Sequence, residues 1–353
     1  METAQNPLRP YKALELLDRA FRIYRDNFTT FIGIVALVMV PTTVISLVMN
    51  TWLSDQVALT QFSTNSSSVN RMSTSQIYGL LGQMFGMYVG VILVDFLIAL
   101  LQGVFVSGPL TYITSERHLG RTVTFGDTWS AVQGRLATLG GALFLFYVIL
   151  GAISIALSFA LCLCGLGFGL VAYIWVALSA FVTPVIILER TSLIAGMQRA
   201  WVLGKARVWP VLGLSIAILV ISFVIGLALG FAIQLLIRPA IGSTSYTVAN
   251  AVQIVLQTIV SVFIAPIWPI TLTLLYYDAR VRVEGLDIAL QAVNKPDPRP
   301  ADVVSPPPPS DWLMSSKDMV NLGIFVMSGF VLVLVLLGLY FVLGFAVLGA
   351  GGL

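Results

Sequence analysis

The sequence predicts an all-α integral membrane protein, and three observations lead to that fold class. Hydrophobic residues fill 58% of the 353 positions and charged residues only 10%, whereas soluble domains carry about 25% charge. The mean hydropathy is +0.95. Uncharged stretches of up to 53 residues recur between short charged segments, and about 20 apolar residues are enough for a helix to cross a bilayer.

The uncharged stretches predict seven transmembrane helices. Two of them share the 53 residues between Arg135 and Glu189, so we expect a helical hairpin with its turn at 162–167. A proline-rich segment separates the first six spans from the seventh. The other expected spans are 31–49, 78–111, one within 208–237, one within 239–277, and one after Asp318.

The distribution of Lys and Arg predicts the orientation, because short cytoplasmic loops retain these residues. Seventeen of the 19 fall on one side of the predicted membrane, and only Arg71 and Arg238 fall on the other. We therefore expect a plasma-membrane protein with a cytoplasmic amino terminus and an external carboxyl terminus.

Three segments that precede odd-numbered spans align without gaps, which indicates an internal repeat. Each is amphipathic at helical spacing, with basic residues opposite apolar ones, so it can lie in the headgroup layer. A cytoplasmic cap packed on the bundle is the alternative. Residues 1–293 are thus expected to form a six-helix bundle of three repeats, each an amphipathic interfacial helix plus a helical hairpin. The expected interfacial anchors are Phe21, Trp129, Trp201, Arg135 and Arg207.

Each even-numbered span contains proline and ends at an acidic and a basic residue. Proline bends a helix because it lacks an N–H donor and clashes with the carbonyl four residues earlier. The bends either line a cavity or are ordinary kinks. The acidic and basic residues are Glu116 with Arg117, Glu189 with Arg190, and Asp278 with Arg280.

Residues 8–290 resemble a known bacterial membrane family. The resemblance rests on the run Leu-Leu-Asp-Arg-Ala-Phe-Arg-Ile-Tyr-Arg-Asp-Asn-Phe at 16–28, on 197–201, and on 276–287 with its Arg-x-Glu-Gly-Leu-Asp segment. These residues are similar to the glycerophosphoryl diester phosphodiesterase membrane domain. That name implies a lipid-derived diester substrate only where the membrane part is fused to a catalytic barrel, and residues 1–353 include none. The resemblance therefore implies a bacterial membrane location and carries over no catalytic residue.

Composition excludes several function classes. A net charge of +3 from scattered residues argues against nucleic acid as a partner. A zinc site needs three or four N or S ligands, and the chain has one His and two Cys. No Walker loop, dinucleotide fingerprint, His-Glu-x-x-His or Gly-x-Ser-x-Gly motif occurs. We expect no enzyme activity, metal or cofactor, and we expect His118 to be solvated or to face the lipid headgroups in a cytoplasmic loop.

Asp95 is the one acid in the middle of a predicted span. A carboxylate there costs about 2.5–3.5 kcal/mol on insertion scales, so it should face the protein interior or water. It is either a proton or cation site in a carrier, or a hydrogen-bonded residue that ties two helices together. Its candidate polar neighbours are Tyr88, Gln102, Gln253 and Gln257.

Gly82, Gly86 and Gly90 form two overlapping Gly-x-x-x-Gly steps on the second span. Such small residues allow a second helix to approach closely. The partner helix belongs either to the bundle or to another chain.

Residues 294–312 hold seven of the 16 prolines and predict an extended cytoplasmic linker. Residues 313–353 then form a tethered seventh transmembrane helix, whose groove we expect on a second copy or another membrane protein, so residues 1–293 should fold without it. Two functions fit this organisation. One is a non-enzymatic scaffold or accessory subunit that contacts membrane lipids, and the other is a carrier for a small solute or lipid with Asp95 at its ion site.

Overall fold

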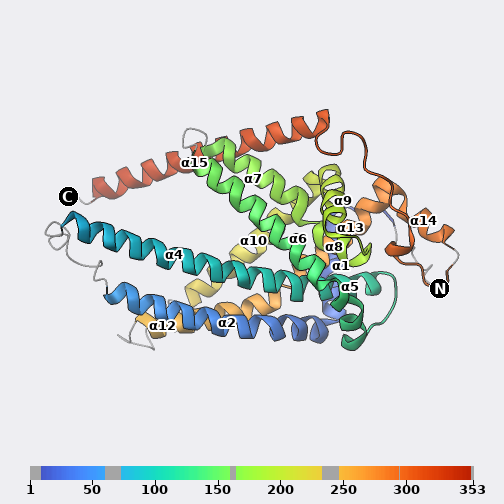
Figure 1. The fold of residues 1–353 in the computed structure, drawn as a ribbon, viewed down its shortest axis with the longest axis horizontal. Coiled ribbons are helices and arrows are strands. Elements are labelled where there is room, and N and C mark those ends of the chain that lie inside the picture. The colour runs from blue at the N-terminus through green and yellow to red at the C-terminus, as the bar shows by residue number, and fades with distance from the viewer. Residues whose placement is uncertain (1–8, 60–72, 160–163, 233–245, 294, 351–353) are drawn as a thin grey trace. The chain divides into compact units, whose positions relative to one another are not determined.

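The computed structural model describes residues 9–59, 73–159, 164–232, 246–293 and 295–350 of this chain. This part of the chain is built from helices and contains no strand (Figure 1). Six of its helical segments are long and apolar enough to cross a membrane, which confirms the multi-pass helical prediction. These segments are Phe28–Met49, Leu81–His118, Phe125–Ala156, Gly169–Leu188, Val208–Ala228 and Ala251–Glu284.

The described residues form a series of helical segments. In chain order they are α1 (Ala13–Asp26), α2 (Phe28–Leu59), α4 (Thr74–Gln102), the π-helix η1 (Gly103–Ser107), α5 (Gly108–His118), α6 (Phe125–Phe159), α7 (Cys164–Ser179), α8 (Val182–Leu188), α9 (Leu193–Ala206), α10 (Val208–Ala232), α12 (Tyr246–Ile264), α13 (Ile267–Glu284), α14 (Leu286–Ala292), the 3₁₀-helix η4 (Pro300–Asp302) and α15 (Ser316–Ala350).

The predicted hairpin turn at 162–167 ends earlier in the sequence than expected. Helix α7 already begins at Cys164, so 164–167 is helical. Residues 160–163 lie outside the described part of the chain.

Each of the three even-numbered spans is interrupted four residues before a proline, as the missing N–H and the ring clash require. Pro184 follows the break between α7 and α8 at Ala180, and Pro269 follows the break between α12 and α13 at Ala265. Four residues before Pro109 lies Phe105, inside the π-helix η1. A π-turn is a recognised cause of a helix kink.

The aligned amphipathic segments differ in how they join their spans. A single residue, Asn27, separates α1 from α2. A single residue, Arg207, likewise separates α9 from α10. At the aligned position Arg135, α6 continues as one helix. The breaks thus match the alignment at two of three positions, and the repeat itself stays a prediction.

The chain divides into two compact units. Unit 1 comprises 1–20, 111–215 and 271–353, and unit 2 comprises 21–110 and 216–270. Unit 1 holds most of the fully buried large side chains, among them Tyr173, Phe181 and Arg280.

In unit 2, α2 packs against α12 and α4. Thr43 Oγ1 and Thr258 Oγ1 lie 3.0 Å apart between α2 and α12, and Gln102 donates to Thr42 Oγ1 at 3.2 Å. Phe28 stacks on Phe263 with ring centroids 6.1 Å apart. These few polar contacts accompany long exposed apolar faces.

Helix α15 packs along α7 within unit 1 (Figure 1). A Cβ on Gly169 of α7 would lie 2.3 Å from the backbone oxygen of Phe325, so the two backbones are in direct contact. Tyr173 meets the Phe325 ring edge-on at 5.3 Å. We expected the groove for this helix on another chain, and the structure instead provides one in the same chain.

The proline-rich segment 294–312 also differs from the free tether we expected. Arg121 donates to the Pro298 carbonyl at 3.0 Å, and Ser305 donates to Glu189 at 2.9 Å. Arg299 pairs with Glu116 at 3.2 Å. Because proline leaves carbonyls without neighbouring N–H donors, side chains of the helical core supply the partners. The segment is therefore part of unit 1.

Candidate functional site

The three acids that end the even-numbered spans have the best-buried carboxylates among the described residues of unit 1. Glu116 is 2% exposed, Asp278 is 1% exposed and the side chain of Glu189 is 3% exposed. A buried carboxylate needs paired cations and hydrogen bonds to offset its desolvation. Each of the three is met by at least two arginines, from different segments of the chain.

Glu189 belongs to a network of two acids and two arginines. Arg199 of α9 lies 3.1 Å from Glu189 and 2.5 Å from Glu284. Arg280 of α13 contacts the same two carboxylates at 3.3 and 2.9 Å. Burial alone would lower the pKa of Arg199, but the hydrogen bond to Glu284 and the charge of Glu189 raise it above its ordinary value. The four charges cancel within unit 1.

Asp278 joins the start of the chain to α9 and α13. Its carboxylate accepts the backbone N–H of Tyr11 at 2.8 Å and pairs with Arg207 at 2.6 Å and Arg282 at 2.9 Å. Arg282 also donates to the Tyr11 carbonyl at 2.8 Å. These contacts join segments more than 260 residues apart in sequence.

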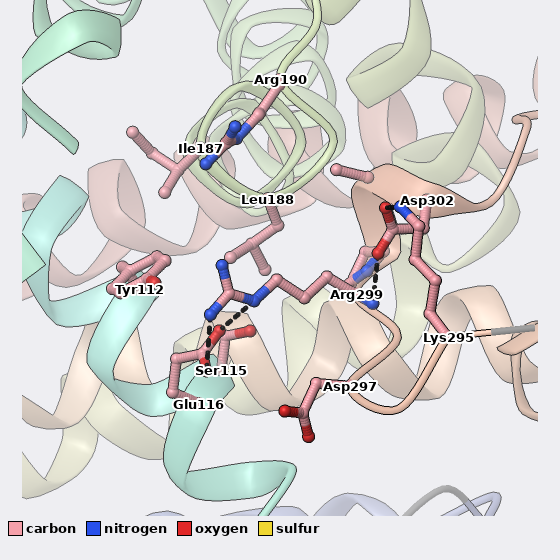
Figure 2. Close-up of a pocket in the computed structure, with 12 residues that line it drawn as sticks. Tyr112, Ser115, Glu116, Ile187, Leu188, Arg190, Lys295, Asp297, Arg299 and Asp302 are labelled. Atoms are coloured by element: carbon pink, nitrogen blue, oxygen red, sulfur yellow. Dashed lines mark hydrogen bonds and ion pairs between the residues drawn. The ribbon is translucent and has the colours of Figure 1, made fainter. Parts of the chain in front are cut away.

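Glu116 forms one wall of a cavity of about 260 Å³ (Figure 2). Arg299 reaches across this cavity to Glu116 at 3.2 Å, and Lys295 pairs with Asp302 at its rim. The hydrogen bonds to Asp302, from Lys295 first and from the Arg299 backbone second, lower the pKa of that carboxyl group. Most of the charged lining is thus already paired.

Arg190 is the exception in this cavity. It is exposed and has no hydrogen bond or ion pair with any described residue. Its φ of 55° lies in the left-handed region, which a residue with a Cβ adopts at a cost. Arg190 is thus the one unpaired charge among the described residues that line this cavity. A single cation is not enough to indicate which ligand the cavity would bind.

A second cavity, of about 540 Å³, lies between the α9–α10 junction and the start of α15. Lys205 and Asp318 pair at 2.5 Å in its wall, with side chains 7% and 9% exposed. Burial raises the pKa of Asp318, but hydrogen bonds from Lys205 and Ser315 outweigh it and lower that pKa below the usual value. Trp209 lines the cavity and donates to Asn321 at 3.1 Å.

The structure does not bring the intramembrane polar candidates together. Asp95 is exposed on α4 and makes no hydrogen bond or ion pair with any described residue. Tyr88 is exposed on the same helix, and Gln253 and Gln257 are exposed on α12. Gln102 is bonded to Thr42 instead.

The expected interfacial anchors fall into two groups. Phe21 and Trp129 are exposed, as a lipid-facing residue would be. Trp201 donates to the Leu313 carbonyl at 2.9 Å, and Arg207 pairs with buried Asp278. Arg135 donates to the Thr191 carbonyl at 3.4 Å. The second group contacts protein, which is the cap arrangement that we gave as the alternative.

Gly82, Gly86 and Gly90 have no described atom within 4 Å of a built Cβ, so within the described chain no helix packs on them. The tightest glycine contacts lie elsewhere. A Cβ on Gly204 of α9 would lie 1.7 Å from the Ala177 carbonyl oxygen of α7. Gly204 ends a run of small residues at every fourth position, with Gly196 and Ala200 before it, so the same spacing occurs here as on α4.

His118 is buried at the end of α5, not solvated as we expected. Its ring lies 4.8 Å from the Tyr277 ring and 6.4 Å from that of Tyr11, and neither ring nitrogen has a hydrogen-bond partner among the described residues. No group of three His, Cys, Asp or Glu side chains in the described chain has the arrangement of a metal site.

The sequence pattern located the buried acids but not most of their partners. The spacing of Asp278 with Arg282 and of Arg280 with Glu284 is the i, i+4 spacing of a helical pair, which is a signal for these two contacts. Arg199 and Arg299 are separated from their acids by turns or by long stretches of chain, so only the fold brings them together.

Comparison with protein families, curated proteins and solved structures gives no match to this chain. The resemblance of residues 8–290 to the phosphodiesterase membrane domain family therefore stays a prediction.

Proposed function

We propose that this chain is a non-enzymatic membrane protein that acts as a scaffold or accessory subunit of a membrane complex. The charged side chains of unit 1 support this function because they neutralise one another. Glu189, Glu284, Arg199 and Arg280 form a closed set, and Asp278 is held by two arginines and a backbone N–H. Groups committed in this way stabilise a rigid frame and are not available as an acid or a base for catalysis.

Helix α4 is the observation that carries the proposal. It is exposed along most of its length, with Asp95 and Tyr88 on one side and the bare glycines 82, 86 and 90 on another. An exposed carboxylate in hydrocarbon costs about 2.5–3.5 kcal/mol on insertion scales. A partner helix that covers Asp95 with a hydrogen-bond donor would remove much of that cost. We infer that α4 is the surface that binds the partner.

A carrier is the second candidate, and Asp95 is the observation that favours it. A carrier acid must exchange ions with water or with a substrate cavity. The two cavities described above are lined by residues of unit 1, and neither includes Asp95. This weakens the carrier function relative to the accessory function.

Photo-crosslinking in the native membrane tests the proposal. A photoreactive residue at Tyr88, next to Asp95 on α4, should give one discrete protein adduct. The same residue at Leu219 on α10, which is similarly exposed, serves as the matched control and should give lipid adducts only.

Lipid adducts alone at position 88 would contradict the accessory function. Purified protein in sealed vesicles is then assayed for proton- or cation-coupled flux. A flux that is present in the wild type and lost in Asp95→Asn, with unchanged folded yield, would establish the carrier instead.

A further inference from the structure

The cavity at the start of α15 lies beside the first residues of α10, which crosses the membrane, and of α15, the predicted seventh span. Helix α10 begins at Val208, which is also the first residue of its membrane-crossing segment. Helix α15 begins at Ser316, and no charged residue follows Asp318. The cavity between these two helix starts therefore lies at the level of the lipid headgroups.

The lining has the composition of a headgroup site. Trp209 and Trp312 both contribute to it, and tryptophan is enriched at the membrane interface because its ring is apolar and its N–H is polar. Trp209 donates to Asn321, whereas the ring N–H of Trp312 has no partner among the described residues. Pro210 and Pro309 add apolar walls.

Four charged side chains line the cavity, and two of them form an ion pair with each other whereas the other two do not. Lys205 and Asp318 are buried and satisfy each other at 2.5 Å. Lys317 and Asp311 are exposed, and neither has a hydrogen bond or ion pair with any described residue. The cavity thus offers one free cation and one free anion with no net charge.

The volume and the surroundings fit a lipid better than a soluble ion. A cavity of about 540 Å³ is far larger than a phosphate ion needs, since one water occupies about 30 Å³ of liquid. Val320 and Ile324 of α15 are exposed and lie three and seven residues beyond Lys317, on the same helix face. They provide an apolar track along which an acyl chain can continue.

We propose that this cavity binds a membrane phospholipid with a zwitterionic headgroup that carries a primary ammonium group. The phosphate lies against Lys317 and the Trp312 N–H, the ammonium lies against Asp311, and one acyl chain follows Val320 and Ile324. A primary ammonium has three donors for a carboxylate, and a quaternary one has none. The site therefore prefers phosphatidylethanolamine to phosphatidylcholine and to anionic phosphatidylglycerol. This proposal does not depend on the accessory function, because binding requires no protein partner.

Native mass spectrometry of the delipidated full-length protein tests the site. The protein is mixed with equal amounts of phosphatidylethanolamine, phosphatidylcholine and phosphatidylglycerol that have identical chains. We expect one phosphatidylethanolamine to be retained at least tenfold over each of the other two lipids. Asp311→Asn should abolish the preference over phosphatidylglycerol, and Lys317→Gln should reduce retention of all three lipids.

Two controls separate this site from general lipid binding. Lys12→Gln removes an exposed lysine in another part of unit 1 and should leave retention and preference unchanged. Soluble glycerophosphoethanolamine should not displace the lipid at concentrations where the intact lipid binds. Equal retention of the three lipids by the wild type, an unaltered preference in Asp311→Asn, or displacement by the soluble headgroup would each overturn the proposal.

Discussion

Unit 1 and unit 2 are stabilised in different ways, although the described residues of both are helical. Unit 1 contains buried ion pairs and glycines at which two helix backbones meet, such as Gly204 and Gly169. Unit 2 has the exposed helix α4 and contacts as modest as the 3.0 Å approach of Thr43 and Thr258. Helices in lipid gain little from apolar burial, so close packing and polar contacts decide which helices associate.

The difference indicates which part of the chain depends on specific internal contacts and which part has surfaces free to contact lipid or a partner. Removal of one partner from a buried ion pair costs about 3–5 kcal/mol, whereas a single hydrogen bond between membrane helices contributes about 0.6 kcal/mol. We therefore expect substitutions in unit 1 to cost more stability than those in unit 2, because the contacts of unit 1 are specific. Unit 2 should tolerate substitution and keep its exposed faces for lipid or for a partner.

The largest expected effect is the loss of the carboxyl-terminal segment. Removal of residues 294–353 leaves Lys205 without Asp318 and takes Arg299 away from Glu116. The Lys205–Asp318 pair is buried, and its loss alone costs about 3–5 kcal/mol, so thermal unfolding in mild detergent should shift strongly downward. Co-expression of 294–353 as a separate chain should restore part of the loss. An unchanged unfolding temperature of the truncated protein would support the independent tether that the sequence predicts.

Arg280→Met should destabilise unit 1 by about 3–5 kcal/mol, because it leaves Glu189 and Glu284 with Arg199 as their remaining cation. Arg25→Met, which removes an exposed cation of unit 2, is the matched control and should change stability by about 0.5 kcal/mol or less. Denaturant or thermal unfolding of the purified variants measures both. Equal losses in the two variants would remove the distinction between the units.

Gly204→Ala should cost about 1–3 kcal/mol, because the new methyl group meets the backbone of α7 and one helix must shift. Gly86→Ala is the control in unit 2, where no described atom lies within 4 Å. The same unfolding assay in detergent should show no loss for Gly86→Ala. If the control loses stability in native membranes only, a partner helix packs on α4, which sharpens the comparison.

The Lys205–Asp318 pair predicts a pH dependence in unit 1. The pKa of Asp318 is lower in the folded protein than the ordinary value of about 3.9, so its contribution is complete above that value. As the pH falls through the lowered pKa, the carboxylate takes up a proton and the contribution is lost. Unfolding measured from about pH 6 down to about pH 2 should show this loss beginning near pH 4, and Asp318→Asn should show a smaller slope. Parallel curves for the two proteins would contradict it.

The smallest effect is expected at the contact between α2 and α12. Thr258→Val keeps the size of the side chain and removes its hydroxyl contact with Thr43. The loss should be about 0.6 kcal/mol, the average for hydrogen bonds between membrane helices. Thr29→Val, on an exposed position of α2, is a suitable control. A loss as large as that of Arg280→Met would mean that polar contacts hold unit 2 as firmly as unit 1.

The sequence by itself determined the membrane class, six of the apolar spans and the proline-linked bends of the three even-numbered spans. These properties follow from local composition, since uncharged stretches must span the bilayer and a proline interrupts the turn before it. The sequence also identified Glu116, Glu189 and Asp278 as unusual, because each ends an apolar span. Part of the Asp278 contact set could be predicted from i, i+4 spacing.

Only the tertiary structure decided what those acids bind and which glycines matter. Arg199 lies ten residues beyond Glu189, and Arg299 lies 183 residues from Glu116, so only the fold brings these charges together. Gly204 and Gly86 share the same four-residue spacing of small residues, and only the fold shows that Gly204 meets another helix. The same holds for α15, whose apolar run fits lipid, a second chain or its own α7 equally well by composition. Lipid and protein interiors are alike in polarity, so hydropathy predicts which helices enter the membrane, and shape decides which of them pack together.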